Sequence, residues 1–145
     1  MTFPEFLNQL TARLKLPAAA APADARNMEV TLKTGQTLSL SLQANDTAVA
    51  VAALLCFYPE PTLQRGLFET LLAANAFGFG TGGATFALDP GTSKVFLFQS
   101  FPLDGLDIEA FAAALRRFVD THRRWKEAYD SGKLLALAKG EAMAA

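Results

Sequence analysis

The sequence holds one thiol and one imidazole, Cys56 and His122, which could together supply a nucleophile and its general base. Cys56 lies within a run of alanine and leucine, and His122 lies on the apolar stripe of a C-terminal helix pattern. Both positions favour packing in a core over catalysis. One histidine and one cysteine also cannot complete a tetrahedral zinc shell without carboxylates, and no metal-ligand spacing accompanies them. We therefore expect no catalytic residue and no metal.

The run from Gly78 to Gly83 could surround a phosphate with backbone N–H groups, because four of its six residues are glycine. A dinucleotide-binding loop follows a strand and opens a helix, whereas this run follows a helical pattern and precedes a strand pattern. It also lacks the Gly-Lys-Ser/Thr ending of a phosphate-binding loop. The run is interpreted as a helix-to-strand connection, and no nucleotide or other cofactor is expected.

Charged residues near the last predicted helix could act as acids, bases or phosphate ligands. Asp104, Asp107 and Glu109 flank the start of this helix, where carboxylates cap free N–H groups and favour the positive end of the dipole. The helix also has a basic side, but acidic residues interrupt it and no aromatic platform accompanies it. A solvated face is therefore favoured over nucleic-acid binding. The basic residues are Arg116, Arg117, Arg123, Arg124 and Lys126.

The composition indicates a single folded domain with more apolar residues than one core is expected to bury. The chain has 145 residues, 51% of them apolar and 19% charged, and such a surplus favours an interface. A net charge of −1 gives no global attraction to nucleic acid or anionic lipid. One cysteine requires no oxidising compartment, and no signal peptide is recognised, so the cytoplasm is expected. The longest apolar stretch, residues 48–58, is about half of the roughly 20 residues that a membrane helix needs.

Hydrophobic spacing in the first half predicts a helix and three strands. Thr2 and Glu5 form a capping box before a stripe of phenylalanine and leucine at helical spacing, and Pro17 ends the helix. Residues 18–27 have no periodicity and are predicted to be a flexible linker. Residues 28–42 alternate around a Thr-Gly-Gln turn and predict a hairpin. Residues 47–58 predict a central strand that is covered on both faces.

The second half predicts a helix, two strands and a final helix. Helical spacing from Leu63 to Ala74 contains Gly66, which would permit another backbone to approach closely. Residues 84–88 and 95–101 predict a second hairpin, and a long apolar stripe predicts a helix from Asp107 to Gly132. The predicted fold is α+β, with a mostly antiparallel sheet of about five strands and three helices, in the order α-β-β-β-α-β-β-α. One domain is expected over 1–132 and a flexible tail over 133–145.

The second half also resembles the CesT/Tir-chaperone family, the class I effector chaperones of bacterial type III secretion. The family pattern is a leucine-rich helix ending in Leu-Leu-x-x-Asn, a glycine-rich link, a strand ending in Leu-Asp-Pro, an apolar strand leading into Pro-Leu, and a last amphipathic helix with a tryptophan. About 65 residues match it in order and spacing. The matching residues are Leu71, Leu72, Asn75, 80–83, Leu88, Asp89, Pro90, 95–99, Pro102, Leu103, Leu106 and 111–125.

This resemblance implies a non-enzymatic homodimer in the bacterial cytoplasm that binds the N-terminal region of a secreted effector and keeps it soluble and export-competent. It makes the secretion ATPase a candidate further partner. It implies a dimer interface on the second helix, here Leu63, Gly66, Leu67 and Leu71. It also implies grooves for the effector that are built by the first helix and adjacent strands. The expected effector-binding residues are Phe3, Phe6, Leu7, Leu10, Val95 and Leu97. The alternative is that all six belong to the core, since one stripe of a helix can pack inward and still leave its rim exposed.

Two alternatives remain open at this point. A protein of the same fold could sequester a regulatory partner in place of a secreted one. A small enzyme or ligand-binding domain could use Cys56, His122 or the glycine run. For the expected effector-binding strand, both Val95/Leu97 and Phe96/Phe98 are apolar, so the sequence does not choose its exposed face.

Overall fold

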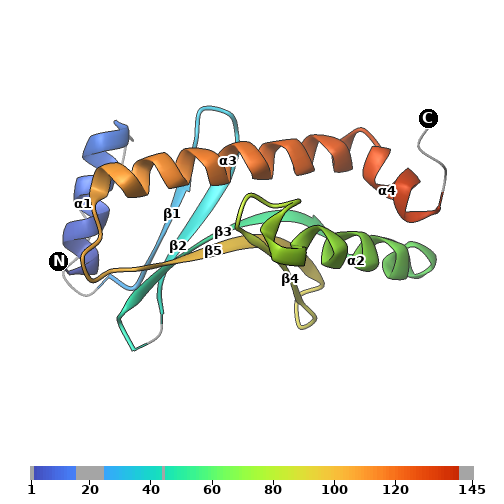
Figure 1. Ribbon diagram of the computed structural model, residues 1–145, viewed down its shortest axis with the longest axis horizontal. Coiled ribbons are helices and arrows are strands. Elements are labelled where there is room, and N and C mark those ends of the chain that lie inside the picture. The colour runs from blue at the N-terminus through green and yellow to red at the C-terminus, as the bar shows by residue number, and fades with distance from the viewer. Residues whose placement is uncertain (1, 16–24, 44, 141–145) are drawn as a thin grey trace. The chain divides into compact units, whose positions relative to one another are not determined.

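The computed structural model describes residues 2–15, 25–43 and 45–140, and most of the linker predicted for 18–27 lies outside these residues. The predicted α+β class is confirmed, and helices and strands follow one another in the predicted order (Figure 1). A 3₁₀ turn after the second helix and a short helix at the end are additions. The elements are α1 (Phe3–Leu14), β1 (Asn27–Thr31), β2 (Thr37–Gln43), β3 (Ala48–Phe57), α2 (Pro61–Asn75), η1 (Ala76–Gly78), β4 (Thr85–Asp89), β5 (Lys94–Pro102), α3 (Ile108–Asp130) and α4 (Lys133–Ala138).

The strands form one sheet in the order β1-β2-β3-β5-β4, so β1 and β4 lie at its two edges. The pairs β1–β2, β2–β3 and β4–β5 are antiparallel, as the alternating pattern and the turns predict. β3 is central, as expected. Its side chains are not covered on both faces along its whole length, however, because Leu54 is 40% exposed.

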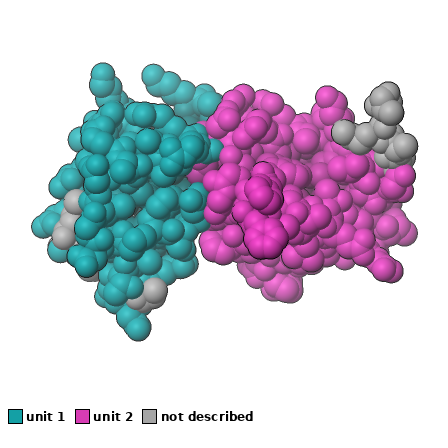
Figure 2. All heavy atoms as spheres, in the orientation of Figure 1, with its two compact units in different colours: residues 1–53, 99–117 teal, residues 54–98, 118–145 magenta. Residues whose placement is uncertain are grey.

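The chain separates into two compact units (Figure 2). Unit 1 comprises residues 1–53 and 99–117, and unit 2 comprises residues 54–98 and 118–145. The single domain expected over 1–132 stays a prediction. Within the described residues, no helix combines the length and the apolar character that crossing a membrane requires.

Unit 1 is organised around aromatic rings contributed by α1 and by the first turns of α3. The predicted capping box starts α1, since Glu5 N–H donates to the Thr2 hydroxyl and Thr2 N–H donates to the Glu5 carboxylate. Phe6 packs edge-on against Phe111 with ring centroids 4.8 Å apart. The Arg13 guanidinium donates two hydrogen bonds to Glu109, which ties the end of α1 to the start of α3.

Unit 2 contains α2, α4, the β4–β5 hairpin and the part of α3 that follows residue 117. The flexible tail predicted from residue 133 is wrong for 133–138, because these residues form α4 and bury Leu134. α4 packs on α2 at Gly66, where an added Cβ would lie 1.9 Å from the Ala138 carbonyl oxygen. The backbone that Gly66 admits is therefore α4 of the same chain.

Candidate binding surfaces

The outer edge of β1 carries backbone groups that no other strand of the sheet uses. Leu42 N–H donates to the Arg26 carbonyl and Leu32 N–H donates to the Gln36 carbonyl, so the even-numbered residues 26 and 32 face β2. Hydrogen-bonded and non-hydrogen-bonded pairs alternate in an antiparallel ladder. The N–H and C=O groups of Asn27, Glu29 and Thr31 therefore point away from β2. Among the described residues, no strand pairs with this side of β1.

The outer edge of β4 is closed at Phe86 by a side chain of its own unit, and Ala84, just before the strand, is also bonded internally. Phe86 N–H donates to Asn75 Oδ1 over 2.7 Å, and Asn75 Nδ2 donates to the Phe86 carbonyl over 3.0 Å. At Ala84 the N–H donates to the Thr81 carbonyl, and the Thr81 hydroxyl donates to the Ala84 carbonyl. Both partners of these two residues are thus internal, which protects the edge from pairing with another strand.

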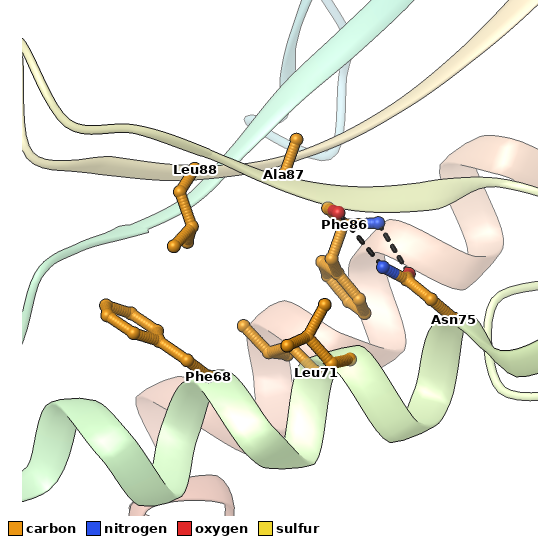
Figure 3. Close-up of a pocket in the computed structure, with 7 residues that line it drawn as sticks. Phe68, Leu71, Asn75, Phe86, Ala87 and Leu88 are labelled. Carbon is orange, nitrogen blue, oxygen red and sulfur yellow. Dashed lines mark hydrogen bonds between the residues drawn. The ribbon is translucent and has the colours of Figure 1, made fainter.

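An apolar groove that is open to solvent runs between α2 and β4, entirely within unit 2 (Figure 3). Asn75 closes one end of it, but both polar atoms of the Asn75 amide are bonded to the Phe86 backbone and offer nothing to a ligand. The groove can therefore accept only apolar groups without leaving polar atoms unpaired. Its lining residues are Phe68, Leu71, Leu72, Asn75, Phe86, Ala87 and Leu88.

Two phenylalanines stand out from the connection between α2 and β4. Phe77 is 95% exposed and Phe79 is 89% exposed, and their rings meet edge-on with centroids 6.3 Å apart. Phe77 has φ of 53°, a left-handed backbone that a bulky side chain rarely adopts. Together we call these two residues the Phe77/Phe79 pair.

The connection that carries the Phe77/Phe79 pair is held by its own backbone and by α3. Gly80 N–H donates to the Ala74 carbonyl, and the N–H groups of Thr81 and Gly83 both donate to the Gly78 carbonyl. The Trp125 indole N–H donates to the Gly80 carbonyl over 2.9 Å. These glycine-run N–H groups are used internally and follow a helix, which agrees with the interpretation of a connection and not of a phosphate loop.

The sequence matches the Tir chaperone protein (CesT) family over residues 5–126, which includes both sheet edges, the groove and the Phe77/Phe79 pair. This chain belongs to the CesT family. The match confirms the resemblance seen in the second half and extends it to α1 and the first three strands. A search of curated proteins finds no significant match to the sequence.

Solved structures with the same fold come from more than one functional setting. The ExsC–ExsE complex matches with 20% identity and a TM-score of 0.65, covering 88% of this chain and 96% of the other. The HopA1–SchA chaperone–effector complex matches with 18% identity and a TM-score of 0.68, covering 87% and 94%. YbjN from E. coli, a candidate transcription regulator, matches with 19% identity and a TM-score of 0.65, covering 88% and 91%. Identities this low establish the fold alone.

The effector-binding residues expected for this CesT-family chain are all buried in the structure. Phe6, Leu7, Leu10, Val95 and Leu97 have no exposed surface, and Phe3 is 3% exposed. The helix residues lie in unit 1 and the strand residues lie in unit 2. Of the two faces of β5, it is Val95 and Leu97 that are covered, while Phe96 and Phe98 are half-buried. Contact of these six residues with an effector stays a prediction.

The expected dimer residues divide between core and surface. Leu67 and Leu71 are buried within one copy, Leu63 is half-buried, and Gly66 lies under α4. Leu71 forms part of the wall of the α2–β4 groove, next to Leu72, which is 67% exposed. The homodimer stays a prediction, and if it uses α2 its contacts would fall on Leu72 and the groove.

The sequence did not predict that Leu72, Phe77 and Phe79 are exposed. It also did not predict the two hydrogen bonds between the Asn75 amide and the Phe86 backbone. The one available signal was that Phe77 and Phe79 belong to no helical or alternating pattern. Their apolar character alone is equally consistent with burial.

Cys56 and His122 are both buried in unit 2. Burial raises the pKa of the Cys56 thiol to about 11, so at neutral pH it is protonated and a poor nucleophile. Burial also lowers the pKa of His122, whose Nε2 lies 2.8 Å from the Leu54 carbonyl and whose ring therefore serves the core. The described residues hold no cluster of three or more side chains suited to a metal.

The basic side of α3 is paired within its own helix. Arg123 and Arg124 both contact Asp120, and Lys126 contacts Asp130 over 2.9 Å. Pairs three or four residues apart are typical of a solvated helix face, which supports that interpretation over phosphate binding.

Proposed function

We propose that this chain is a type III secretion chaperone that binds the N-terminal region of a secreted effector, keeps it soluble and export-competent, and presents it to the secretion apparatus. The observation that carries the proposal is the CesT-family match over residues 5–126. The similarity in fold to the HopA1–SchA chaperone–effector complex supports it. On this proposal the chain acts by binding alone, in the bacterial cytoplasm, as a homodimer, with the secretion ATPase as a further partner.

The outer edge of β1 is the place that we propose for an effector segment. An extended peptide gains affinity by adding a strand to an exposed edge, where it pairs with free backbone groups. The outward N–H and C=O groups of Asn27, Glu29 and Thr31 offer such a template, and their side chains are exposed. β4 offers much less, because Asn75 and Thr81 occupy its backbone groups at Phe86 and Ala84.

The buried apolar residues of α1 are not directly accessible to an effector in this proposal. Phe3, Phe6, Leu7 and Leu10 pack inward, so an effector side chain would reach them only if α1 moved. The same requirement of movement applies to Val95 and Leu97 on β5. A chaperone site that uses the β1 edge first requires no such movement.

The experiment is co-production of the chain with the N-terminal segment of a candidate secreted effector from the same bacterium. We expect the effector segment to be soluble and to co-purify with the chain. Glu29→Pro removes an outward N–H without removing a β1–β2 hydrogen bond, and proline is tolerated on such edges. Glu29→Pro is expected to lower effector retention several-fold, whereas Glu29→Ala, the matched control, retains it. Retention that is equal in both variants would exclude the β1 edge.

A regulatory role is the second candidate, because the fold is shared with YbjN, a candidate transcription regulator. In that case the chain would sequester a regulator that is not itself secreted. Export assays separate the two functions, since loss of the chain would lower secretion of an effector directly only if it is a chaperone. Binding of a non-secreted regulator, with effector stability and export unchanged in a strain lacking the chain, would replace the export proposal.

A further inference from the structure

We propose that the outer edge of β1 selects an effector segment in which apolar and polar residues alternate, with a cationic side chain opposite Glu29. This inference rests on the proposed function and names the chemistry of the segment that would bind at that edge. Backbone pairing alone would accept almost any extended peptide, because every residue except proline carries the same N–H and C=O groups. Selection must therefore come from the side chains on the two faces of β1.

The two faces of β1 differ in chemistry. Val30 is 7% exposed and its partner on β2, Leu38, is 1% exposed, so the even-numbered residues of β1 face the core of unit 1. The odd-numbered residues face the other way, and their partners on β2 are serine and threonine. The Thr31 and Thr37 hydroxyls lie 3.3 Å apart, which places this pair on the polar face. A strand added beside β1 would continue both faces, because side chains alternate along every strand.

The apolar face is incompletely covered at its outer edge. Met28 and Leu32 are half-buried, whereas Leu38 and Leu40, one strand further in, are each 1% exposed. Apolar side chains of an added strand would lie beside Met28 and Val30 and remove this surface from water. Methionine is flexible and polarisable, so Met28 can pack against apolar side chains of different shapes.

Glu29 gives the polar face its charge. It is the only charged residue within β1 and β2, and its side chain is exposed. Arg26, just before β1, donates to Asp46 over 2.7 Å and is paired there, and Lys33 lies in the turn that follows β1. In the described ranges, no ion pair involves Glu29. A lysine or arginine directly opposite on an added strand would supply a cross-strand partner of opposite charge.

The same carboxylate opposes pairing of β1 with a second copy of the chain. In the antiparallel register that uses the whole of β1, the two Glu29 side chains would lie directly opposite each other, and like charges in that position destabilise a strand pair. Charged residues on edge strands prevent such edge-to-edge association. The charge therefore favours a cationic effector segment over another β1 strand.

The alternation also determines the register of the added strand. A slip by one residue would move its apolar side chains to the polar face of Asn27, Glu29 and Thr31. A slip by two residues would keep the faces but move the cation away from Glu29. The shortest segment that satisfies both requirements has five residues in the order polar, apolar, cationic, apolar, polar.

The test uses three probe strands, each joined to the N-terminus of the full chain through a flexible glycine–serine linker of about 20 residues. The tether gives an effective concentration on the order of millimolar, so that weak pairing is detected. The first probe is Thr-Val-Lys-Val-Thr, which reads the same in both directions. The second has glutamate in place of the lysine. The third, Val-Thr-Lys-Thr-Val, has the composition of the first but places valine on the polar face.

The measurement is amide hydrogen exchange at Asn27, Glu29 and Thr31, whose N–H groups point away from β2. We expect the lysine probe to slow exchange at all three residues about five-fold more than the glutamate probe does, because opposite and like charges across a strand pair differ by about that factor. The Val-Thr-Lys-Thr-Val probe should slow exchange little. The difference between the lysine and glutamate probes should shrink at high salt, which screens exposed charges.

Glu29→Lys is the matched reversal. Neither the N–H nor the C=O of Glu29 takes part in the β1–β2 ladder and its side chain is exposed, so the variant should fold normally. It should favour the glutamate probe by a similar factor. Glu29→Gln should protect both probes alike, because removing the charge removes the preference and not the backbone pairing.

Equal protection by the lysine and glutamate probes on the natural chain, or protection by neither, would overturn the proposal. So would a preference for lysine that persists in Glu29→Lys. Failure of the chaperone function gives a different result. An effector segment that co-purifies while the probes show no preference overturns this inference alone, whereas probes that pair selectively when no effector is retained would overturn the proposed function and leave the selectivity of the β1 edge standing.

Discussion

Unit 1 and unit 2 differ in what they leave available to a partner. Unit 1 buries its large apolar side chains but leaves the backbone groups along one side of β1 unused by the sheet. In unit 2, Asn75 occupies the outward backbone groups of the edge strand at Phe86. All the large hydrophobic side chains that are exposed among the described residues belong to this unit. Unit 1 thus presents backbone groups at its surface, whereas unit 2 presents apolar side chains.

The difference between the units is tested most strongly by removing one phenylalanine side chain from each of them. Phe6→Ala deletes a fully buried ring that packs on Phe111, so the free energy of unfolding should fall by about 3–5 kcal/mol. Phe77→Ala deletes a ring that is 95% exposed, so the change in a single copy should stay within about 0.5 kcal/mol. Urea unfolding measures both values. The Phe77→Ala measurement requires protein concentrations low enough to dissociate a dimer. At higher concentrations, loss of a dimer interface would lower the unfolding free energy further.

One substitution in unit 2 is expected to free the outward backbone groups of β4 at Phe86. Asn75→Ala leaves the N–H and carbonyl of Phe86 without their side-chain partners, and the expected loss in unfolding free energy is about 1–3 kcal/mol. Amide hydrogen exchange at Phe86 should accelerate at the same time. Asn27→Ala on the exposed edge of unit 1 is the matched control and should change stability by less than about 0.5 kcal/mol. Equal losses in the two variants would mean that Asn75 does not close the edge.

Local patterns predict unit 1 and the sheet well. The capping box at Thr2 and Glu5 starts α1, and alternation around the turn at residues 33–35 yields the β1–β2 register. These features depend on neighbours within a few residues, which the sequence displays directly. The family resemblance added Asn75 as the last residue of α2. The hydrogen bonds of Asn75 to Phe86, eleven residues later, depend on where β4 lies, and no local sequence pattern indicates them.

At Gly66 the expectation of a closely packed backbone is confirmed within one copy of the chain. A glycine inside a helix does indicate a close backbone, and the structure has one at Ala138. The family resemblance assigns Gly66 to a dimer interface, which stays a prediction, and the pattern that ends the ordered chain at Gly132 gives no sign of α4. Leu134 to Leu137 form only a short apolar stretch after that glycine, too short to be recognised as a helix by periodicity.

The Gly66 contact gives a prediction of intermediate size. Gly66→Ala places a Cβ where α4 now lies, so α4 should undock and expose Leu134, with a loss of about 1 kcal/mol in unfolding free energy. Hydrogen exchange over 133–138 reports the undocking. The control is the same substitution in a chain that ends at residue 132, where alanine should instead stabilise α2 by up to about 1 kcal/mol. A loss that persists in the shortened chain would place the strain elsewhere in unit 2.

Mild acid is expected to lower the stability of unit 2 more than that of unit 1. This is the smallest of the predicted effects. The only histidine of the chain is His122 in unit 2, and burial lowers its pKa in the folded state below the ordinary value of 6.5. The unfolded chain therefore takes up the proton first as the pH falls, so stability is full above about pH 6.5 and declines below it until the folded-state pKa is reached. Lys126 acts in the same direction by opposing a second positive charge.

Unit 1 contains no histidine. The Arg13 hydrogen bond lowers the pKa of Glu109 below its ordinary value of 4.5, so this pair responds only to stronger acid. Between pH 6.5 and 5, hydrogen exchange should accelerate in 118–138 and around Leu54, while 3–14 and 108–117 change little. His122→Gln keeps a donor for the Leu54 carbonyl and cannot take up the proton, so its urea midpoint should be nearly flat over the same range. If the natural chain and His122→Gln fall equally, or if exchange in unit 1 accelerates first, then the buried imidazole is not what distinguishes the two units in acid.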